Sequence, residues 1–232
     1  MMKILITGSS SGIGEEVARV LLDQGHVVLG VARTAAKWQL LDKRFIFYQT
    51  DFKLIDQSAQ IFDKIIKDHK DVDILFINAG YGEFKSLEQF SDKQVIECFN
   101  VNFLTQILLV KRILPYLKRL GNKKIIFMGS SAANNGANKG SIYCASKFAL
   151  KGFCQSLRKE ALHNNISVTI INPDMVNSNF YQEHNFTYGD SADNYITTQQ
   201  VNEIVQLILR FDNNINIDEI NLSPMKKVIK SK

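Results

Sequence analysis

The segment KILITGSSSGIG, from Lys3 to Gly14, places a glycine-rich turn between a short apolar run and the start of a helical pattern. Lys3–Ile6 has the composition of a buried strand, and apolar residues from Ile13 to Gln24 recur with helical period. His26–Ala32 follows as a continuous apolar run, which is typical of a buried parallel strand. The segment therefore predicts the first strand, turn and helix of a βαβ unit.

The same alternation of apolar runs and helical patterns continues along the chain. The predicted strands are Arg44–Gln49, Val72–Ile77, Lys124–Met128, Ile166–Ile171 and Ile215–Leu222, and the predicted helices are Ile55–His69, Asp92–Phe99, Phe103–Leu120, Tyr143–His163 and Val201–Phe211. Apolar strands that alternate with helices favour a parallel sheet covered on both faces. We expect an α/β fold, a Rossmann-like doubly wound seven-stranded parallel sheet with helices on both faces, in a single domain of residues 1–232.

Composition excludes several classes of protein. The three cysteines include no CxxC pair, so neither a disulfide framework nor a metal site is expected. No signal-peptide pattern occurs, and no apolar stretch approaches the roughly 20 residues of a membrane span. We therefore expect a soluble, cytoplasmic protein with no membrane or nucleic-acid partner. The lysines that cluster near the C-terminus indicate a solvated, frayed end; they are Lys226, Lys227, Lys230 and Lys232.

The glycine turn has a spacing of G-x-x-x-G-x-G at Gly8, Gly12 and Gly14. Glycine lets the backbone approach a ligand closely, and a helix N-terminus offers free N–H groups to a phosphate. An isolated glycine motif is also compatible with a purely structural turn. The strand before it and the helix after it favour dinucleotide binding.

The end of the second predicted strand bears on the choice of cofactor. An acidic residue there would accept a hydrogen bond from a ribose 2′-hydroxyl, but the chain has Ala32 followed by Arg33. The guanidinium of Arg33 suits a 2′-phosphate, although an exposed loop arginine is the alternative interpretation. We expect NADP(H) as the cofactor, with NAD(H) less favoured.

Tyr143 and Lys147 stand four residues apart at the start of the long predicted helix, so they share one helical face. A nearby ammonium group favours the phenolate and would let a tyrosine act as a general acid or base. Ser130 lies thirteen residues before Tyr143, where its hydroxyl would hold a substrate oxygen. Asn78 and Asn102 fall where loops meet the carboxyl ends of the strands.

These motifs together resemble the short-chain dehydrogenase/reductase superfamily, in the subgroup with TGxxxGxG, NAG and Ser–Tyr–Lys motifs. The resemblance implies that Ser130 binds the substrate oxygen and that Tyr143 transfers the proton. It implies that Lys147 binds the nicotinamide ribose and lowers the tyrosine pKa, while Asn102 holds a water of a proton relay. The implied cofactor site comprises Gly8, Ser10, Ser11, Gly12, Ile13, Gly14, Arg33, Asp51, Asn78, Ala79, Gly80, Tyr143, Lys147, Pro173, Val176 and Ser178.

The chain departs from the family after the sixth predicted strand. The family has Pro-Gly followed by a threonine that contacts the nicotinamide carboxamide, whereas this chain has Pro173-Asp174 and then Ser178. A serine hydroxyl can make the same hydrogen bond. The carboxylate of Asp174 has no evident role in the sequence.

We expect an NADP(H)-dependent oxidoreductase that interconverts a small-molecule carbonyl and an alcohol. The alternatives are a non-catalytic NADP(H)-sensing protein of the same fold and a nucleotide-sugar epimerase or dehydratase, for whose extra C-terminal region the chain has little room. Aromatic residues in the segment Phe180–Gln199, the flap, suit an apolar or planar substrate or simply pack. By resemblance, the apolar helices Phe103–Leu120 and Tyr143–His163 form the interface of a homodimer or homotetramer.

Overall fold

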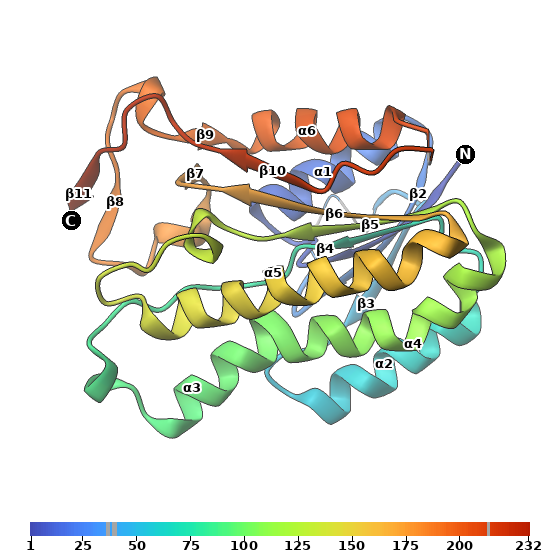
Figure 1. The fold of residues 1–232 in the computed structure, drawn as a ribbon, viewed down its shortest axis with the longest axis horizontal. Coiled ribbons are helices and arrows are strands. Elements are labelled where there is room, and N and C mark those ends of the chain that lie inside the picture. The colour runs from blue at the N-terminus through green and yellow to red at the C-terminus, as the bar shows by residue number, and fades with distance from the viewer. Residues whose placement is uncertain (36–37, 39–40, 213) are drawn as a thin grey trace.

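Seven parallel strands form one sheet in the computed structural model, which describes residues 1–35, 38, 41–212 and 214–232. The strand order is β10-β6-β5-β4-β1-β2-β3. Figure 1 shows this sheet between its layers of helices. The strands are β1 (Lys3–Thr7), β2 (Val27–Ala32), β3 (Phe45–Gln49), β4 (Ile74–Ile77), β5 (Lys123–Met128), β6 (Ile166–Pro173) and β10 (Glu219–Leu222). The predicted doubly wound parallel sheet is confirmed, although its last strand is shorter than Ile215–Leu222.

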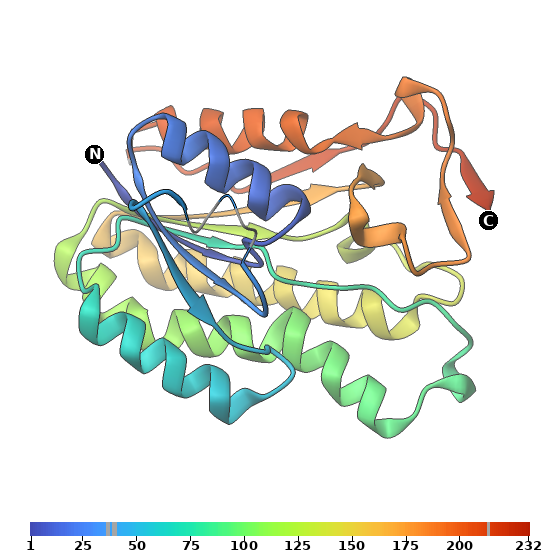
Figure 2. The same ribbon diagram turned by 180° about the vertical axis from the view of Figure 1, so that it is seen from behind.

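Helices cover both faces of the sheet, as predicted (Figures 1 and 2). One layer contains α2 (Ile55–Asp68), α4 (Thr105–Leu120) and α5 (Ser141–Ala161), and the other contains α1 (Gly12–Asp23) and α6 (Thr198–Arg210). Each layer buries its own apolar core against the strands. No helix in the described residues has both the length and the apolar character needed to cross a bilayer.

A turn of π-helix, Asn100–Leu104, joins α3 (Asp92–Phe99) to α4. It was not predicted from the sequence, which places a break before Phe103. Two backbone carbonyl groups of the wider turn accept hydrogen bonds from side chains. The Thr105 hydroxyl donates to Asn100 O at 2.6 Å, and the Gln106 amide donates to Val101 O at 2.9 Å. Such turns are rare and often accompany functional sites.

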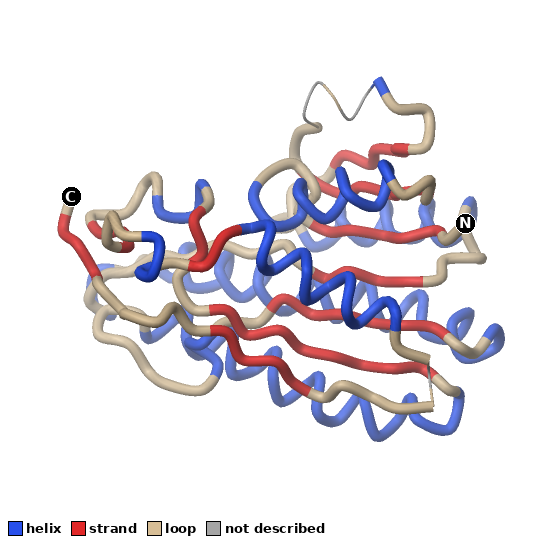
Figure 3. The backbone as a smooth tube through the Cα atoms, turned by 90° about the horizontal axis from the view of Figure 1, so that it is seen from above, coloured by secondary structure: helices blue, strands red, loops and turns tan. Residues whose placement is uncertain are grey.

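The C-terminal residues are ordered against the flap, so the prediction of a frayed end is wrong. Strand β11 (Ile229–Ser231) pairs antiparallel with β8 (Phe186–Tyr188), apart from the main sheet (Figure 3). Lys227 forms an ion pair with Asp174 at 2.7 Å, and Lys226 forms one with Asp193 at 2.9 Å. The lysine side chains are exposed, as predicted, but their acidic partners lie far away in the sequence, so the ion pairs were not predicted.

The order in which strands are added to the sheet reverses at β1, because β2 lies on one side of it and β4 on the other. The carboxyl end of β1 is therefore the topological switch point of the sheet. The fully buried Thr7 ends this strand. Its hydroxyl accepts hydrogen bonds from the backbone N–H groups of Asn78 and Ala79, both at 3.0 Å, and donates to Gln106 Oε1 at 2.9 Å. One side chain therefore fixes the loop after β4 and the start of α4.

We expect Thr7→Val to lower the free energy of unfolding, because it keeps the side-chain shape and leaves buried polar groups unpaired. Each such group costs about 1–3 kcal/mol. Thr7→Ser, which keeps the hydroxyl, is the matched control and should lose less. Urea denaturation of the three proteins measures the difference, and equal stability of the valine and serine variants would contradict this role for the hydroxyl.

Candidate functional site

A cleft of about 770 Å³ lies at the carboxyl ends of the strands, where parallel sheets of this topology bind ligands. Most of the predicted site residues line it, from the glycine turn, the strand-end loops, α5 and the flap. Those on its wall are Gly8, Ser10, Ser11, Gly12, Ile13, Arg33, Asp51, Asn78, Ala79, Gly80, Ser130, Tyr143, Lys147, Pro173, Val176 and Ser178. Gly14 and Asn102 are not on the wall; both are buried.

The glycine turn has a backbone that only glycine adopts easily. Gly8 and Gly12 have φ of +68° and +58°. A Cβ at Gly8 would lie 2.9 Å from Ala79 Cα, and a Cβ at Gly14 would lie 2.1 Å from the carbonyl oxygen of Gly8. Gly14 thus brings the helix close to the turn, while α1 begins at the cleft. This arrangement fits the phosphates of a dinucleotide.

Arg33 follows the last residue of β2, is exposed, and lines the cleft beyond the glycine turn. Asp51 follows β3 on the same side, and its carboxylate accepts a hydrogen bond from the backbone N–H of Lys53 at 3.0 Å. The two residues place a guanidinium and a carboxylate at the end of the cleft that an adenosine would occupy.

Ser130 is held from behind by Asn172 of β6. The Oδ1 atom of Asn172 accepts a hydrogen bond from the Ser130 backbone N–H at 3.2 Å. A Cβ at Gly129 would lie only 2.0 Å from that same oxygen, so glycine is required for the contact. The sequence did not single out Gly129 or Asn172, because their contact joins two separate strands.

Tyr143 and Lys147 lie on α5 with the Lys147 Nζ atom 5.8 Å from the centre of the tyrosine ring. Tyr143 is 7% exposed, and burial raises its pKa to about 12, although a hydrogen bond with Ser130 opposes the rise. Burial also lowers the pKa of Lys147 to about 8, and its Nζ donates to Met128 O at 3.0 Å. In the ligand-free protein the pKa of Tyr143 thus lies above its usual value, because burial outweighs the hydrogen bond. That Lys147 lowers this pKa stays a prediction.

Asn102 lies in the π-helical turn, with a fully buried side chain. Its Oδ1 accepts from Tyr81 N at 2.9 Å, while its Nδ2 donates to Tyr81 O at 2.9 Å and to Ser146 Oγ at 3.0 Å. A Cβ at Gly80 would lie 3.2 Å from Asn102 Oδ1 and 3.4 Å from Lys147 Nζ. The amide therefore fixes the loop beside Lys147 through bonds to protein groups.

Comparison with known proteins identifies the family. Residues 2–188 match the sequence profile of the short-chain dehydrogenases. The chain belongs to the short-chain dehydrogenase family. Members of the family are oxidoreductases that act on CH–OH and C=O groups, and this chain is an oxidoreductase of that kind.

Relatives of this short-chain dehydrogenase include a 3-ketodihydrosphingosine reductase of Bacteroides thetaiotaomicron, 30% identical over 86% of this chain and 75% of that protein. Retinol dehydrogenase 8 of Homo sapiens is 32% identical over 76% of this chain and 60% of its own length. The crystal structure of an alcohol dehydrogenase from Thermococcus sibiricus, complexed with 5-hydroxy-NADP, has a TM-score of 0.86. It is 24% identical and covers 98% of this chain and 99% of its own, which shows the shared fold.

Asp174, at the position of the family glycine, faces the C-terminal segment of this short-chain dehydrogenase. Its carboxylate pairs with Lys227, and its backbone N–H donates to Leu222 O at 2.9 Å. Ser178, at the family threonine position, accepts a hydrogen bond from Phe180 N at 3.4 Å. The Ser178 Cβ lies 3.4 Å from where a Cβ at Gly12 would be, so it faces the glycine turn.

An aromatic cluster covers Tyr143, and sequence patterns gave no signal for its geometry. The ring of Phe84 lies 5.3 Å from that of Tyr143, and the ring of Phe180 lies 5.9 Å from it. His184 contacts both phenylalanine rings, at 5.2 and 5.7 Å. The Nε2 atom of His184 is buried and has no hydrogen-bond partner among the described residues. Of this cluster, Tyr143, Phe180 and His184 line the cleft, and Phe84 packs against Tyr143 and His184.

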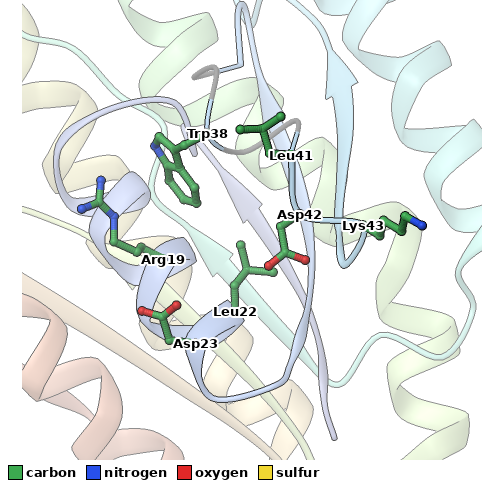
Figure 4. Close-up of a pocket in the computed structure, with 7 residues that line it drawn as sticks. All are labelled: Arg19, Leu22, Asp23, Trp38, Leu41, Asp42 and Lys43. Atoms are coloured by element: carbon green, nitrogen blue, oxygen red, sulfur yellow. The ribbon is translucent and has the colours of Figure 1, made fainter.

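Another cavity, of about 740 Å³, lies away from this chemistry, on the surface between α1 and the loop that follows β2 (Figure 4). Its lining is Arg19, Leu22, Asp23, Trp38, Leu41, Asp42 and Lys43, and it includes none of the predicted site residues. Residues 36–37 and 39–40, which neighbour it in the sequence, lie outside the described residues. We assign it no function.

Proposed function

We propose that this short-chain dehydrogenase, as a single domain of residues 1–232, transfers a hydride between NADP(H) and a carbonyl or alcohol. The observation that carries the proposal is the meeting of Ser130, Tyr143 and Lys147 in the same cleft as the glycine turn. A bound nicotinamide dinucleotide supplies or accepts the hydride.

The protonation state of Tyr143 in the ligand-free protein supports a role as the proton donor in carbonyl reduction. With a pKa raised to about 12, the Tyr143 phenol carries its proton at neutral pH. It can donate this proton to the substrate oxygen while the carbonyl carbon accepts the hydride. Ser130 holds that oxygen, and the Lys147 ammonium stabilises the phenolate that remains. In alcohol oxidation, the same phenolate takes the proton back.

The substrate end of the cleft favours an apolar molecule. Phe180, Tyr181 and Tyr143 line the cleft there, with Phe84 packed against Tyr143, and aromatic surfaces bind alkyl chains or planar rings. His184 also lines the cleft and adds one polar side chain beside these rings. The names of the sphingosine and retinol relatives are consistent with an apolar substrate class.

A panel of ketones and aldehydes, with NADPH oxidation as the readout, tests the activity. We expect turnover, with the highest kcat/KM on carbonyls that carry an aromatic ring or a long alkyl chain. Tight NADPH binding with no turnover across a broad panel would instead indicate the non-catalytic sensor.

Tyr143→Phe should reduce kcat by about 10²–10⁴-fold on a substrate from the panel, since a positioned acid typically contributes this factor. NADPH affinity and the unfolding midpoint should stay close to those of the wild type. Tyr48→Phe is the matched control, because Tyr48 is a buried tyrosine that pairs with His69 away from the cleft. A Tyr143→Phe variant that turns over like the control would overturn the assignment.

The preference for NADP(H) rests in this proposal on Arg33. No carboxylate stands at the end of β2 to accept from a 2′-hydroxyl or to repel a 2′-phosphate. A guanidinium pairs with phosphate through two hydrogen bonds. Such charge-assisted bonds contribute about 1.5–3 kcal/mol, which corresponds to a preference of about 10- to 150-fold.

Titration with NADPH and NADH tests this preference. Wild-type protein should bind NADPH more tightly by this factor, and Arg33→Ala should lose the margin while NADH affinity stays unchanged. Arg112→Ala, which removes an arginine that pairs with Asp63 outside the cleft, is the matched control. Equal affinities in the wild type, or an intact preference in Arg33→Ala, would show that Arg33 does not select the cofactor.

We also propose a homodimer or homotetramer formed through α4 and α5, in the cytoplasm, where buried free cysteines stay reduced. Among the apolar residues of these helices, Leu109, Ile113 and Leu157 are buried within one chain and are not available to a partner. Phe148 of α5 is 47% exposed and remains available for an interface.

Light scattering at micromolar concentration should give a mass of two or four chains. Phe148→Asp should shift the mass towards one chain, because it would bury a charge in the interface. Leu207→Asp, on an equally exposed position of α6 at the opposite face, is the control and should keep the wild-type mass. A monomeric wild type would contradict the proposal.

A further inference from the structure

The C-terminal segment 226–232, which we call the strap, lies along the flap. Strand β11 pairs with β8 from Ile229–Tyr188 to Ser231–Phe186. Two further backbone bonds extend the pairing, from Gly189 N to Val228 O at 3.0 Å and from Lys232 N to Asn185 O at 2.9 Å. Figures 1 and 2 show β8 and β11 side by side beyond the carboxyl ends of the main strands.

Every lysine of the strap binds a group on or beside the flap. Lys226 pairs with Asp193, Lys230 pairs with Asp190, and Lys232 donates to the backbone oxygen of Tyr181. Lys227 instead reaches Asp174, with its Nζ 2.7 and 3.0 Å from the two carboxylate oxygens. The strap therefore connects the flap to the end of β6.

The Asp174–Lys227 pair differs from the other ion pairs of the strap in its burial. The Lys227 side chain is 54% exposed, but that of Asp174 is only 13% exposed, whereas that of Asp190 is 86% exposed. Solvent and salt screen exposed pairs, which contribute little, but they screen a partly buried pair less. Asp174 also lines the cleft, so this pair is the direct link between the strap and the site.

The flap carries one of the two rings that lie against Tyr143 and contacts the other. Phe180 contacts the Tyr143 ring, and Phe186 contacts Phe84 at 5.1 Å, which in turn contacts Tyr143. Because Phe186 is also a residue of β8, strap pairing fixes the same strand that supports the aromatic cluster. A displacement of the strap would therefore move the apolar wall against which a substrate binds.

We propose that the Asp174–Lys227 ion pair is a positioning pair, which holds the strap and thereby sets the flap over Tyr143. The pair acts on substrate affinity and not on proton transfer, because neither residue contacts Ser130 or Lys147 in the described residues. This inference rests on the proposed function for its kinetic part. The proposal assigns a role to the carboxylate of Asp174, which stands where the family has a glycine.

Hydrogen exchange of peptides from the flap tests the positioning without any ligand or turnover. Lys227→Met should accelerate flap exchange by about tenfold, the factor that corresponds to about 1.4 kcal/mol. Lys227→Arg should restore protection, since it keeps the charge. Lys3→Met, which breaks an ion pair with Asp71 at the opposite end of the strands, should leave flap exchange unchanged. Unchanged exchange in Lys227→Met would overturn the proposal.

A double-mutant cycle separates the pair from its two members. If Asp174 and Lys227 act through each other, Asp174→Asn combined with Lys227→Met should expose the flap no more than either single change. Additive effects would show that the residues act independently and would also overturn the proposal.

Kinetics with a substrate from the carbonyl panel tests the effect on binding. Lys227→Met should raise KM for the substrate with little change in kcat, and NADPH affinity should be unaffected. A fall in kcat at constant KM would overturn the role in substrate binding. Absence of turnover in the wild type would refute the proposed function, while the exchange experiment would still decide whether the pair positions the flap.

Discussion

The buried hydroxyl of Thr7 is the interaction on which the arrangement of the site depends. It lies at the end of β1, where the strand order reverses. It forms hydrogen bonds with two N–H groups of the loop after β4 and with one side chain of α4. A strand, a loop and a helix from separate parts of the chain thereby meet at one oxygen. The glycine turn continues from the same residue, so the two walls of the cleft are set relative to each other at this point.

Burial is the common cause of the unusual protonation at the site, and it acts in opposite directions on the two central groups. It raises the pKa of the Tyr143 phenol and lowers that of the Lys147 ammonium, because the charged form of each loses solvation. The two pKa values therefore move apart, to about 12 and about 8. In the ligand-free protein the tyrosine is therefore protonated and can act as an acid. A bound group that brings positive charge beside the phenol would instead favour the phenolate.

The sequence predicted the sheet well, because strands buried on both faces are apolar throughout and the glycine turn has a distinctive spacing. It also predicted which loops meet, since the carboxyl ends of parallel strands share an edge. The π-helical turn was missed because Thr105 and Gln106 cap it by contacts that have no periodic pattern. The pairing of the C-terminal lysines was missed because their acidic partners are distant in the chain, and a linear pattern does not show such charge complementarity. His184 was passed over because no spacing pattern marks its buried Nε2 atom.

The pairing of β11 with β8 has a consequence for the order in which the protein is assembled. Residues 226–232 follow β10, the last strand of the main sheet, so they are synthesised after every strand of that sheet. The flap strand has no β partner until those residues emerge. The aromatic surface over Tyr143 therefore gains this support only after all the strands of the main sheet have been synthesised.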